Sequence, residues 1–191
     1  MPRLFVVAGP SGVGKNTVLA SVLRQRVQAV VNPSVTTRPP RPGEEDGRNR
    51  RFVSEEQFAW MVQDGAFLEH AEYGGYSYGT PAAAVEASLT SGKDVILEIE
   101  LQGVRQVKAK RPDAVTIFLE PPSWEILEKR LRERGTEDPE ALERRLERAK
   151  IELASAHEFA NRVVNNDIEE AATAILAIMA KANHERTSPP R

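Results

Sequence analysis

A glycine-rich segment, GPSGVGK at residues 9–15, directly follows the apolar run at residues 4–8. Glycines at this spacing let successive backbone N–H groups point inward around an anion, next to the positive end of a helix dipole. Lys15 adds a positive charge that can reach the terminal phosphates of a nucleotide. An amphipathic stretch at residues 17–23 follows, so the pattern predicts a strand, a phosphate-binding loop and a helix. A glycine-rich turn without a ligand would not explain a lysine at this position.

Two arginines, Arg38 and Arg41, lie three residues apart in a proline-rich segment at residues 38–42. Arginine binds phosphate through planar, bidentate hydrogen bonds, and prolines reduce the entropy that such a loop loses on ordering. A solvated basic loop is the alternative. The hydroxyls of Ser34 and Thr36 and the nearby phosphate-binding loop favour a second phosphate site.

Two acidic residues lie where a carboxylate needs a partner. Glu69 has apolar neighbours in the sequence, and an unpaired buried carboxylate is costly. Guanine would satisfy it, because this base offers a ring N–H and an exocyclic amine side by side. Glu100 ends an apolar strand, at the carboxyl edge where α/β proteins bind ligands. For both residues a salt bridge to a nearby arginine is an equally open alternative.

Apolar runs separated by helical patterns indicate an α/β protein. Residues 95–99 and 115–119 are nearly continuously apolar, as expected for parallel strands covered on both faces. We therefore expect a doubly wound core with a five-stranded parallel sheet. The expected strands are residues 4–8, 29–31, 94–100, 114–119 and 162–165.

Two stretches do not fit this core. Residues 34–88 are expected to form an inserted small domain, with a helix that starts at a capping box, Ser54 to Gln57. Residues 127–151 are rich in charged and poor in apolar side chains, so we expect them to bury little surface and to form a mobile helical flap. A helix is expected to end at Gly135, and the next helix to start at Asp138-Pro139. The core is then residues 1–33, 89–126 and 152–183, and residues 184–191 are a flexible tail.

Composition narrows the function classes. At 191 residues with 40% hydrophobic content, the chain fits one domain with small insertions and a full core. Its net charge of −2 shows no overall basic bias towards nucleic acid or membrane. The absence of cysteine excludes disulfides, thiol catalysis and cysteine-based metal sites. The apolar runs are too short for a membrane span, and Met1–Arg3 leads straight into a strand, so we expect a cytoplasmic protein without a signal peptide.

Several motifs occur in a fixed order along the chain. After the phosphate loop come Ser-x-Thr-Thr-Arg-x-x-Arg-x-Gly-Glu, Phe-Leu-Glu-x-Ala, Tyr-Gly-Thr, Glu-Ile-x-x-Gln-Gly, Pro-Pro-Ser and Arg-Gly-Thr-Glu. With these motifs the chain resembles the guanylate kinases from about Leu4 to Ala171. The resemblance implies the fold of P-loop nucleoside monophosphate kinases, with a core, a GMP-binding domain at residues 34–88 and a lid at residues 127–151. It also implies transfer of the γ-phosphoryl group of ATP to GMP, and to dGMP, with Mg²⁺, giving ADP and GDP.

The resemblance also implies roles for individual residues. The ATP phosphates would contact Gly9, Pro10, Ser11, Gly12, Val13, Gly14, Lys15, Asn16 and Thr17, with Arg130 from the lid and Asn165 at the adenine edge. GMP would contact Ser34, Arg38, Arg41, Arg50, Glu69, Tyr78, Thr80 and Glu100. Lys15, Arg41, Arg134 and Arg145 would carry catalysis, and Thr17 would reach the metal, directly or through water. For the lid arginines, helical ion pairs with Glu128 or Glu133 are the alternative. We expect a monomer or a small homo-oligomer with no nucleic-acid or membrane partner.

Three positions depart from the family pattern. Asn16 replaces the usual Ser or Gly, so Thr17 or a bridging water would have to serve Mg²⁺. Glu100 stands where the family has Asp. Arg50 stands where the family has a Tyr that meets the GMP phosphate; it could add a third guanidinium there, or it could turn to solvent beside acidic residues 44–46.

Two other functions remain as alternatives. An inactive guanylate-kinase-like module that binds phosphopeptides would lack a working phosphate loop, whereas Lys15, Arg38 and Arg41 are all present. A P-loop kinase that acts on another acceptor, such as a sugar phosphate, would have no use for Glu69 in its apolar context.

Overall fold

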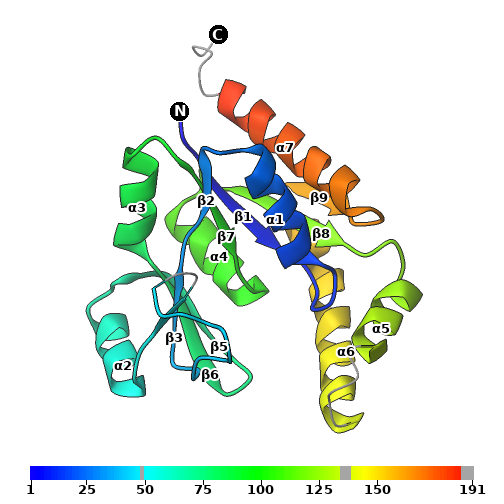
Figure 1. The fold of residues 1–191 in the computed structure, drawn as a ribbon, viewed down its shortest axis with the longest axis horizontal. Coiled ribbons are helices and arrows are strands. Elements are labelled where there is room, and N and C mark those ends of the chain that lie inside the picture. Colours follow the sequence, from blue (N-terminus) through cyan, green and yellow to red (C-terminus); the bar gives the residue numbers. More distant parts are fainter. Residues whose placement is uncertain (48–49, 134–138, 186–191) are drawn as a thin grey trace. The chain divides into compact units, whose positions relative to one another are not determined.

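The computed structural model describes residues 1–47, 50–133 and 139–185 (Figure 1). Its strands are β1 (Leu4–Ala8), β2 (Ala29–Val31), β3 (Ser34–Thr36), β4 (Arg50–Phe52), β5 (Phe67–Tyr73), β6 (Tyr76–Pro81), β7 (Asp94–Glu98), β8 (Val115–Glu120) and β9 (Asn161–Val164). Its α-helices are α1 (Lys15–Gln25), α2 (Glu55–Gln63), α3 (Ala82–Thr90), α4 (Leu101–Lys110), α5 (Trp124–Glu133), α6 (Pro139–Ala154) and α7 (Ile168–Glu185), with a short 3₁₀ turn, η1 (Ser155–Glu158).

Five strands form the predicted parallel sheet, in the order β2-β7-β1-β8-β9. The α/β fold class is therefore confirmed. Strand β7 ends at Glu98, two residues earlier than expected, because Glu100 is already the N-cap residue of α4. Strand β9 starts one residue early and ends before Asn165, whose backbone N–H donates to the carbonyl of Glu120.

The chain divides into two compact units, each of which is described by itself. The first unit comprises Phe5–Val27 and Val115–Arg191. In it β1 pairs in parallel with β8, and β8 pairs with β9. The register sets Ala8 beside Phe118, so the loop after β1 leaves from the carboxyl edge of this part of the sheet. Helices α1 and α7 pack side by side (Figure 1), and Ser21 Oγ donates to Glu169 Oε2 at 2.7 Å between them.

The expected flap buries only a few apolar side chains in the part that the structure describes. Leu127 and Leu131 on α5 and Leu146 and Ala149 on α6 are buried, because the apolar side chains of each helix share one face. The other side chains described between 127 and 151 are exposed or half-buried, and the mobility of the flap stays a prediction. The expected break at Gly135 lies outside the described residues.

The second unit comprises Pro2–Leu4 and Gln28–Ala114. Besides the β2–β7 pair it holds a four-stranded sheet in the order β4-β3-β6-β5, in which β6 runs antiparallel to both neighbours and β4 parallel to β3. Helix α2 covers this sheet through Phe58, which stacks on Phe67 with ring centroids 4.7 Å apart and contacts Val35. The sequence predicted an inserted domain here but not this sheet, because its strands are short and irregular in pattern.

The capping box of α2 is present as predicted. Ser54 Oγ accepts from the backbone N–H of Gln57, and Gln57 Oε1 accepts from the backbone N–H of Ser54, each at 3.1 Å. In the part of the chain that the structure describes, no helix is long and apolar enough to cross a membrane.

Replacing the capping hydroxyl should weaken the second unit. Ser54→Ala leaves backbone N–H groups of the first turn of α2 without this acceptor, so the free energy of unfolding should fall by about 1 kcal/mol. Chemical denaturation measures this. The exposed Thr90 near the end of α3 provides the control, since Thr90→Ala should change stability by less than about 0.5 kcal/mol. Equal effects of the two substitutions would contradict the role of the cap.

Candidate functional site

In the first unit, the loop between β1 and α1 turns at two glycines in the left-handed region. Gly14 is the N-cap of α1 with a φ of 98° and Gly12 has a φ of 84°, values that side-chain-bearing residues rarely adopt. A Cβ at Gly14 would also lie 2.7 Å from Asn165 Nδ2. Because α1 begins at Lys15, the backbone N–H groups of its first turn and the positive end of its dipole adjoin this loop.

The Lys15 ammonium folds back over the loop. Its Nζ donates to the carbonyl of Gly9 at 2.6 Å and approaches that of Pro10 at 3.4 Å. Carbonyl oxygens carry no net charge, so these contacts hold the ammonium in place and leave its positive charge available to an anion.

Three further side chains fix the same loop from distant parts of the sequence. Buried Asn165 donates from Nδ2 to the carbonyl of Val13 at 2.7 Å. Arg130 Nη1 reaches the same carbonyl at 3.4 Å, and Arg145 Nη2 donates to Ser11 Oγ at 2.8 Å. The sequence assigned Asn165 to the adenine edge and did not foresee its bond to the loop. No periodicity signals a contact between positions so far apart in the chain.

A hollow of about 310 Å³ adjoins the loop within the first unit. It is lined by Gly12, Gly14, Thr17, Arg130, Asn165, Asn166, Asp167 and Ile168. Thr17 is exposed on the first turn of α1. Arg134, the remaining predicted lid arginine, lies outside the described residues.

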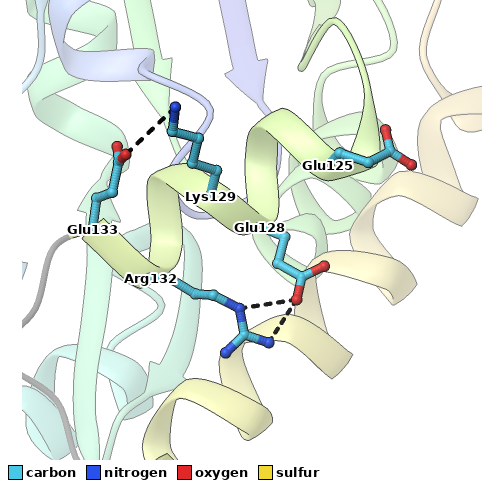
Figure 2. A pocket seen from close by; sticks show the side chains of 5 residues that line it. All are labelled: Glu125, Glu128, Lys129, Arg132 and Glu133. Atoms are coloured by element: carbon cyan, nitrogen blue, oxygen red, sulfur yellow. Dashed lines mark hydrogen bonds and ion pairs between the residues drawn. The ribbon is translucent and has the colours of Figure 1, made fainter.

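A second hollow, of about 440 Å³, lies on α5 and is lined by charged side chains only (Figure 2). Arg132 Nη2 pairs with Glu128 at 2.6 Å and Lys129 with Glu133 at 3.7 Å. The lining also includes Glu125, so acidic groups outnumber basic ones and the hollow does not favour an anion. Exposed pairs of this kind contribute at most about 1 kcal/mol. Glu128 and Glu133, the alternative partners considered for the lid arginines, are thus paired with Arg132 and Lys129.

In the second unit, a carboxylate holds the predicted phosphate ligands together. Arg38 Nη2 donates to Glu44 Oε1 and Oε2 at 2.9 and 2.8 Å, and Arg38 Nη1 donates to the carbonyl of Pro39 at 2.7 Å. Glu44 Oε2 also accepts from the backbone N–H of Arg41 at 2.8 Å, while the Arg41 side chain is exposed. Glu44 thus occupies the bonding positions that a phosphate would take. From the sequence, Glu44 was considered only as a possible surface partner of Arg50, although the Gly-Glu ending of the arginine motif was a signal for a role beside Arg38.

These contacts shift the pKa values of both Arg38 and Glu44. Burial disfavours the charged Arg38, but the hydrogen bonds and charge of Glu44, with a smaller contribution from Tyr78, raise the pKa of this guanidinium above its ordinary value. The backbone N–H of Arg41 and then the side chain of Arg38 lower the pKa of Glu44. Both groups are therefore charged at neutral pH.

Arg50 is half-buried and contacts two other residues of the predicted GMP site. Its Nη1 donates to Ser34 Oγ at 2.9 Å, and its guanidinium carbon lies 5.7 Å from the centre of the Tyr78 ring. Ser34, Arg38, Arg50 and Tyr78 are thus brought together around Glu44. The contact of Arg50 with the GMP phosphate stays a prediction.

Glu69 is buried and paired with Thr80. The two residues lie opposite each other on β5 and β6, and Thr80 Oγ1 donates to Glu69 Oε1 at 2.5 Å. Glu69 is only 5% exposed, so burial raises the pKa of this carboxyl, while the hydrogen bonds of Thr80 and the charge of Lys110 act against the rise. Glu100 lies two residues beyond the end of β7, at the N-cap of α4. Glu69 is thus buried, as its apolar sequence neighbours predicted, whereas Glu100 lies past the end of the strand that it was expected to end. The roles of both residues in binding stay predictions.

Comparisons with known proteins show which family the chain is part of. The guanylate kinase family model matches residues 1–182. The chain belongs to the guanylate kinase family. It is thus an enzyme of this kinase family.

Individual guanylate kinases are similar over nearly the whole chain. That of Thermobifida fusca (strain YX) is 50% identical over 178 residues, which are 93% of this chain and 91% of the relative. A guanylate kinase of Thermus thermophilus is 52% identical over 177 residues, 93% of this chain and 80% of the relative. The crystal structure of guanylate kinase from Anaplasma phagocytophilum superimposes with a TM-score of 0.75 at 31% identity, covering 98% of this chain and 87% of that one.

The bonds of Glu44 predict that this carboxylate competes with anions. In Glu44→Gln the amide keeps the size of the side chain but removes its negative charge, so inorganic phosphate should bind about tenfold more tightly, since bonds to the freed guanidinium would be charge-assisted. Calorimetric titration with phosphate measures this. The control Glu45→Gln changes the net charge by the same amount one residue away, and its phosphate affinity should stay within about twofold of the parent. Unchanged or weaker binding in Glu44→Gln would show that the carboxylate only orders the loop.

Proposed function

We propose that this protein transfers the γ-phosphoryl group of ATP to GMP, and also to dGMP, giving ADP and GDP. The observation that carries the proposal is the buried carboxylate of Glu69, held by Thr80 in the same unit as the cluster of Arg38, Arg50 and Tyr78. On this proposal, a base-selective group and a phosphate-binding group would belong to one compact unit. The family membership supports the phosphoryl transfer itself.

Selection of guanine would follow from the acceptor-only character of an ionised carboxylate. The ring N–H and the exocyclic amine of guanine can donate to Glu69 together. Adenine presents an unprotonated ring nitrogen at the corresponding place, so a buried acceptor would face another acceptor. A site built around buried polar groups rejects such a ligand strongly, because the groups are left unpaired.

The acceptor phosphate would be bound by Ser34, Arg38, Arg41, Arg50 and Tyr78, with Glu44 displaced from Arg38. Glu100, at the carboxyl end of β7, would serve the acceptor side as well. These contacts go to base and phosphate and none requires the ribose 2′-hydroxyl, which supports the acceptance of dGMP. Residues 34–88 would then be the GMP-binding domain.

The donor phosphates would lie in the loop from Gly9 to Asn16, where backbone N–H groups and the ammonium of Lys15 offer positive charge. The residues also fit Mg²⁺, which keeps much of its water and binds mainly through phosphate oxygens. The exposed hydroxyl of Thr17 beside the loop would supply the protein's contact with the ion, directly or through water. When bound, Mg²⁺ neutralises charge on the phosphate oxygens.

The arginines of residues 127–151 would add positive charge next to the oxygens of the transferred phosphoryl group. Arg130 and Arg145 already contact the phosphate loop through Val13 and Ser11, and Arg134 is assigned by the resemblance alone. Phosphoryl transfer depends on positioning and on stabilising the charge of the equatorial oxygens. A lid at residues 127–151 would bring these guanidinium groups in and exclude water.

A coupled assay with ATP and Mg²⁺ tests the proposed acceptor. GMP and dGMP should react, IMP should react poorly because it lacks the exocyclic amine, and AMP and sugar phosphates should not react measurably. Turnover of a sugar phosphate in place of GMP would support the other kinase alternative. No turnover of any acceptor, together with phosphopeptide binding, would support the inactive module.

The substitution Glu69→Gln tests whether Glu69 serves base recognition, since it should change the KM for GMP without lowering the free energy of unfolding. The amide would present a donor to the guanine N–H groups, so the KM for GMP should rise by roughly 10-fold or more, as expected for a mispaired buried group. The free energy of unfolding at neutral pH should not fall, because ionised Glu69 is disfavoured by burial. A raised pKa means that the stability contribution of Glu69 is present at low pH and lost as the pH rises through the folded-state value, so any gain from Gln should shrink at acidic pH. An unchanged KM would make Glu69 a structural residue only.

Lys15→Met tests the donor loop. The substitution keeps the length of the side chain and removes its charge, so kcat should fall on the order of 10²–10³-fold, with GMP affinity retained. Lys129→Met, on the exposed face of α5, is the matched control and should leave turnover within about twofold. Turnover of Lys15→Met within about tenfold of the parent would exclude the assigned role of this loop.

A further inference from the structure

Gly103 is a buried glycine inside helix α4. Glycine is a poor residue in a helix, and alanine is the most favourable one. Gly103 does not belong to the glycines with positive φ in the described part of the chain. The need for glycine at this position must therefore arise from what lies against it.

The neighbour of Gly103 is the carboxylate of Glu69. A Cβ built at position 103 would lie 2.4 Å from Glu69 Oε2 and 3.1 Å from its carboxyl carbon, and 3.3 Å from Cδ1 of Ile99. So close an approach to the carboxylate oxygen does not persist, and one of the two groups would have to move. Glu69 is held by Thr80 at 2.5 Å and is buried, so it has little room to turn away.

Helix α4 is also fixed against β5 on both sides of Glu69. Gln106 accepts from the backbone N–H of His70 at 3.1 Å and donates to its carbonyl at 2.7 Å. Lys110 Nζ donates to the carbonyl of Phe67 at 3.0 Å. Positions 103, 106 and 110 share one face of a helix. The helix cannot retreat from Glu69 without breaking the bonds at His70 and Phe67.

We propose that Gly103 is a positioning residue for purine selection: the missing side chain leaves the space in which the Glu69 carboxylate lies, and α4 thereby sets the position of the group that reads the base. The proposal rests on the proposed function for its catalytic consequence. The steric claim does not depend on that function. It states only that a side chain at position 103 and the carboxylate at position 69 cannot occupy the same space.

Kinetics test the consequence for selection. Gly103→Ala should raise the KM for GMP at least about tenfold, change kcat at saturating GMP by less than about threefold, and leave the KM for ATP unchanged. The preference for GMP over IMP should fall by a similar factor, because a displaced carboxylate no longer meets both donors of guanine. Gln102→Ala, one residue earlier on the exposed side of α4, should change none of these values. An unchanged KM and an unchanged GMP-to-IMP preference in Gly103→Ala would overturn the proposal.

A stability cycle tests the steric relation without any activity. With Glu69 present, Gly103→Ala should lower the melting temperature. With Glu69→Ala as the background, the same substitution should leave the melting temperature unchanged or raise it, because alanine favours the helix and meets no carboxylate. An equal loss in both backgrounds would overturn the proposal by assigning the clash to another neighbour, such as Ile99. If the parent does not phosphorylate GMP, the proposed function fails, and this cycle still decides the steric relation.

Discussion

The second unit of this protein depends on one constraint, the removal of the Glu69 carboxylate from water. Burial raises the pKa of this group, so the ionised form has to be stabilised by donors. The side chain and the backbone N–H of Thr80 both donate to it, and the charge of Lys110 adds a weaker attraction. The pairing of β5 with β6 and the bonds of α4 to β5 fix the carboxylate between them. A ligand with two adjacent N–H donors is the natural complement of such a group.

Several basic groups of both units are paired within the protein itself, and this explains how clustered cations are tolerated. Arg38 bonds Glu44, and Arg50 bonds Ser34 and lies over Tyr78. In the first unit Lys15 bonds backbone carbonyls. These partners limit repulsion and keep the donors oriented. A phosphate that binds them as proposed would replace an anionic or neutral partner and would not have to order a flexible side chain.

Local patterns in the sequence were enough to predict the parallel sheet, the phosphate loop and the capping box at Ser54, because each is signalled within a few consecutive residues. The burial of Glu69 could also be predicted, because its sequence neighbours are apolar, while its role in base recognition stays a prediction. Three contacts were not predicted: the hydrogen bond of Asn165 to the loop, the two hydrogen bonds of Gln106 to β5, and the ion pair of Glu44 with Arg38. The first two join positions far apart in the chain, and the third depends on how the proline-rich segment turns, which side-chain periodicity does not report.

The most direct test of the account is the pKa of Glu69 measured with and without GMP. Carbon-13 spectra of carboxyl-labelled glutamate, assigned with Glu69→Gln, follow this ionisation as the pH changes. The account predicts a raised pKa in the free protein and a lower one in the GMP complex, because two N–H donors stabilise the carboxylate, with a smaller decrease for IMP. By linkage, GMP should then bind more weakly as the pH falls through the pKa of the free protein. A pKa that stays the same or rises when GMP binds would contradict the assignment of Glu69 as the group that selects guanine.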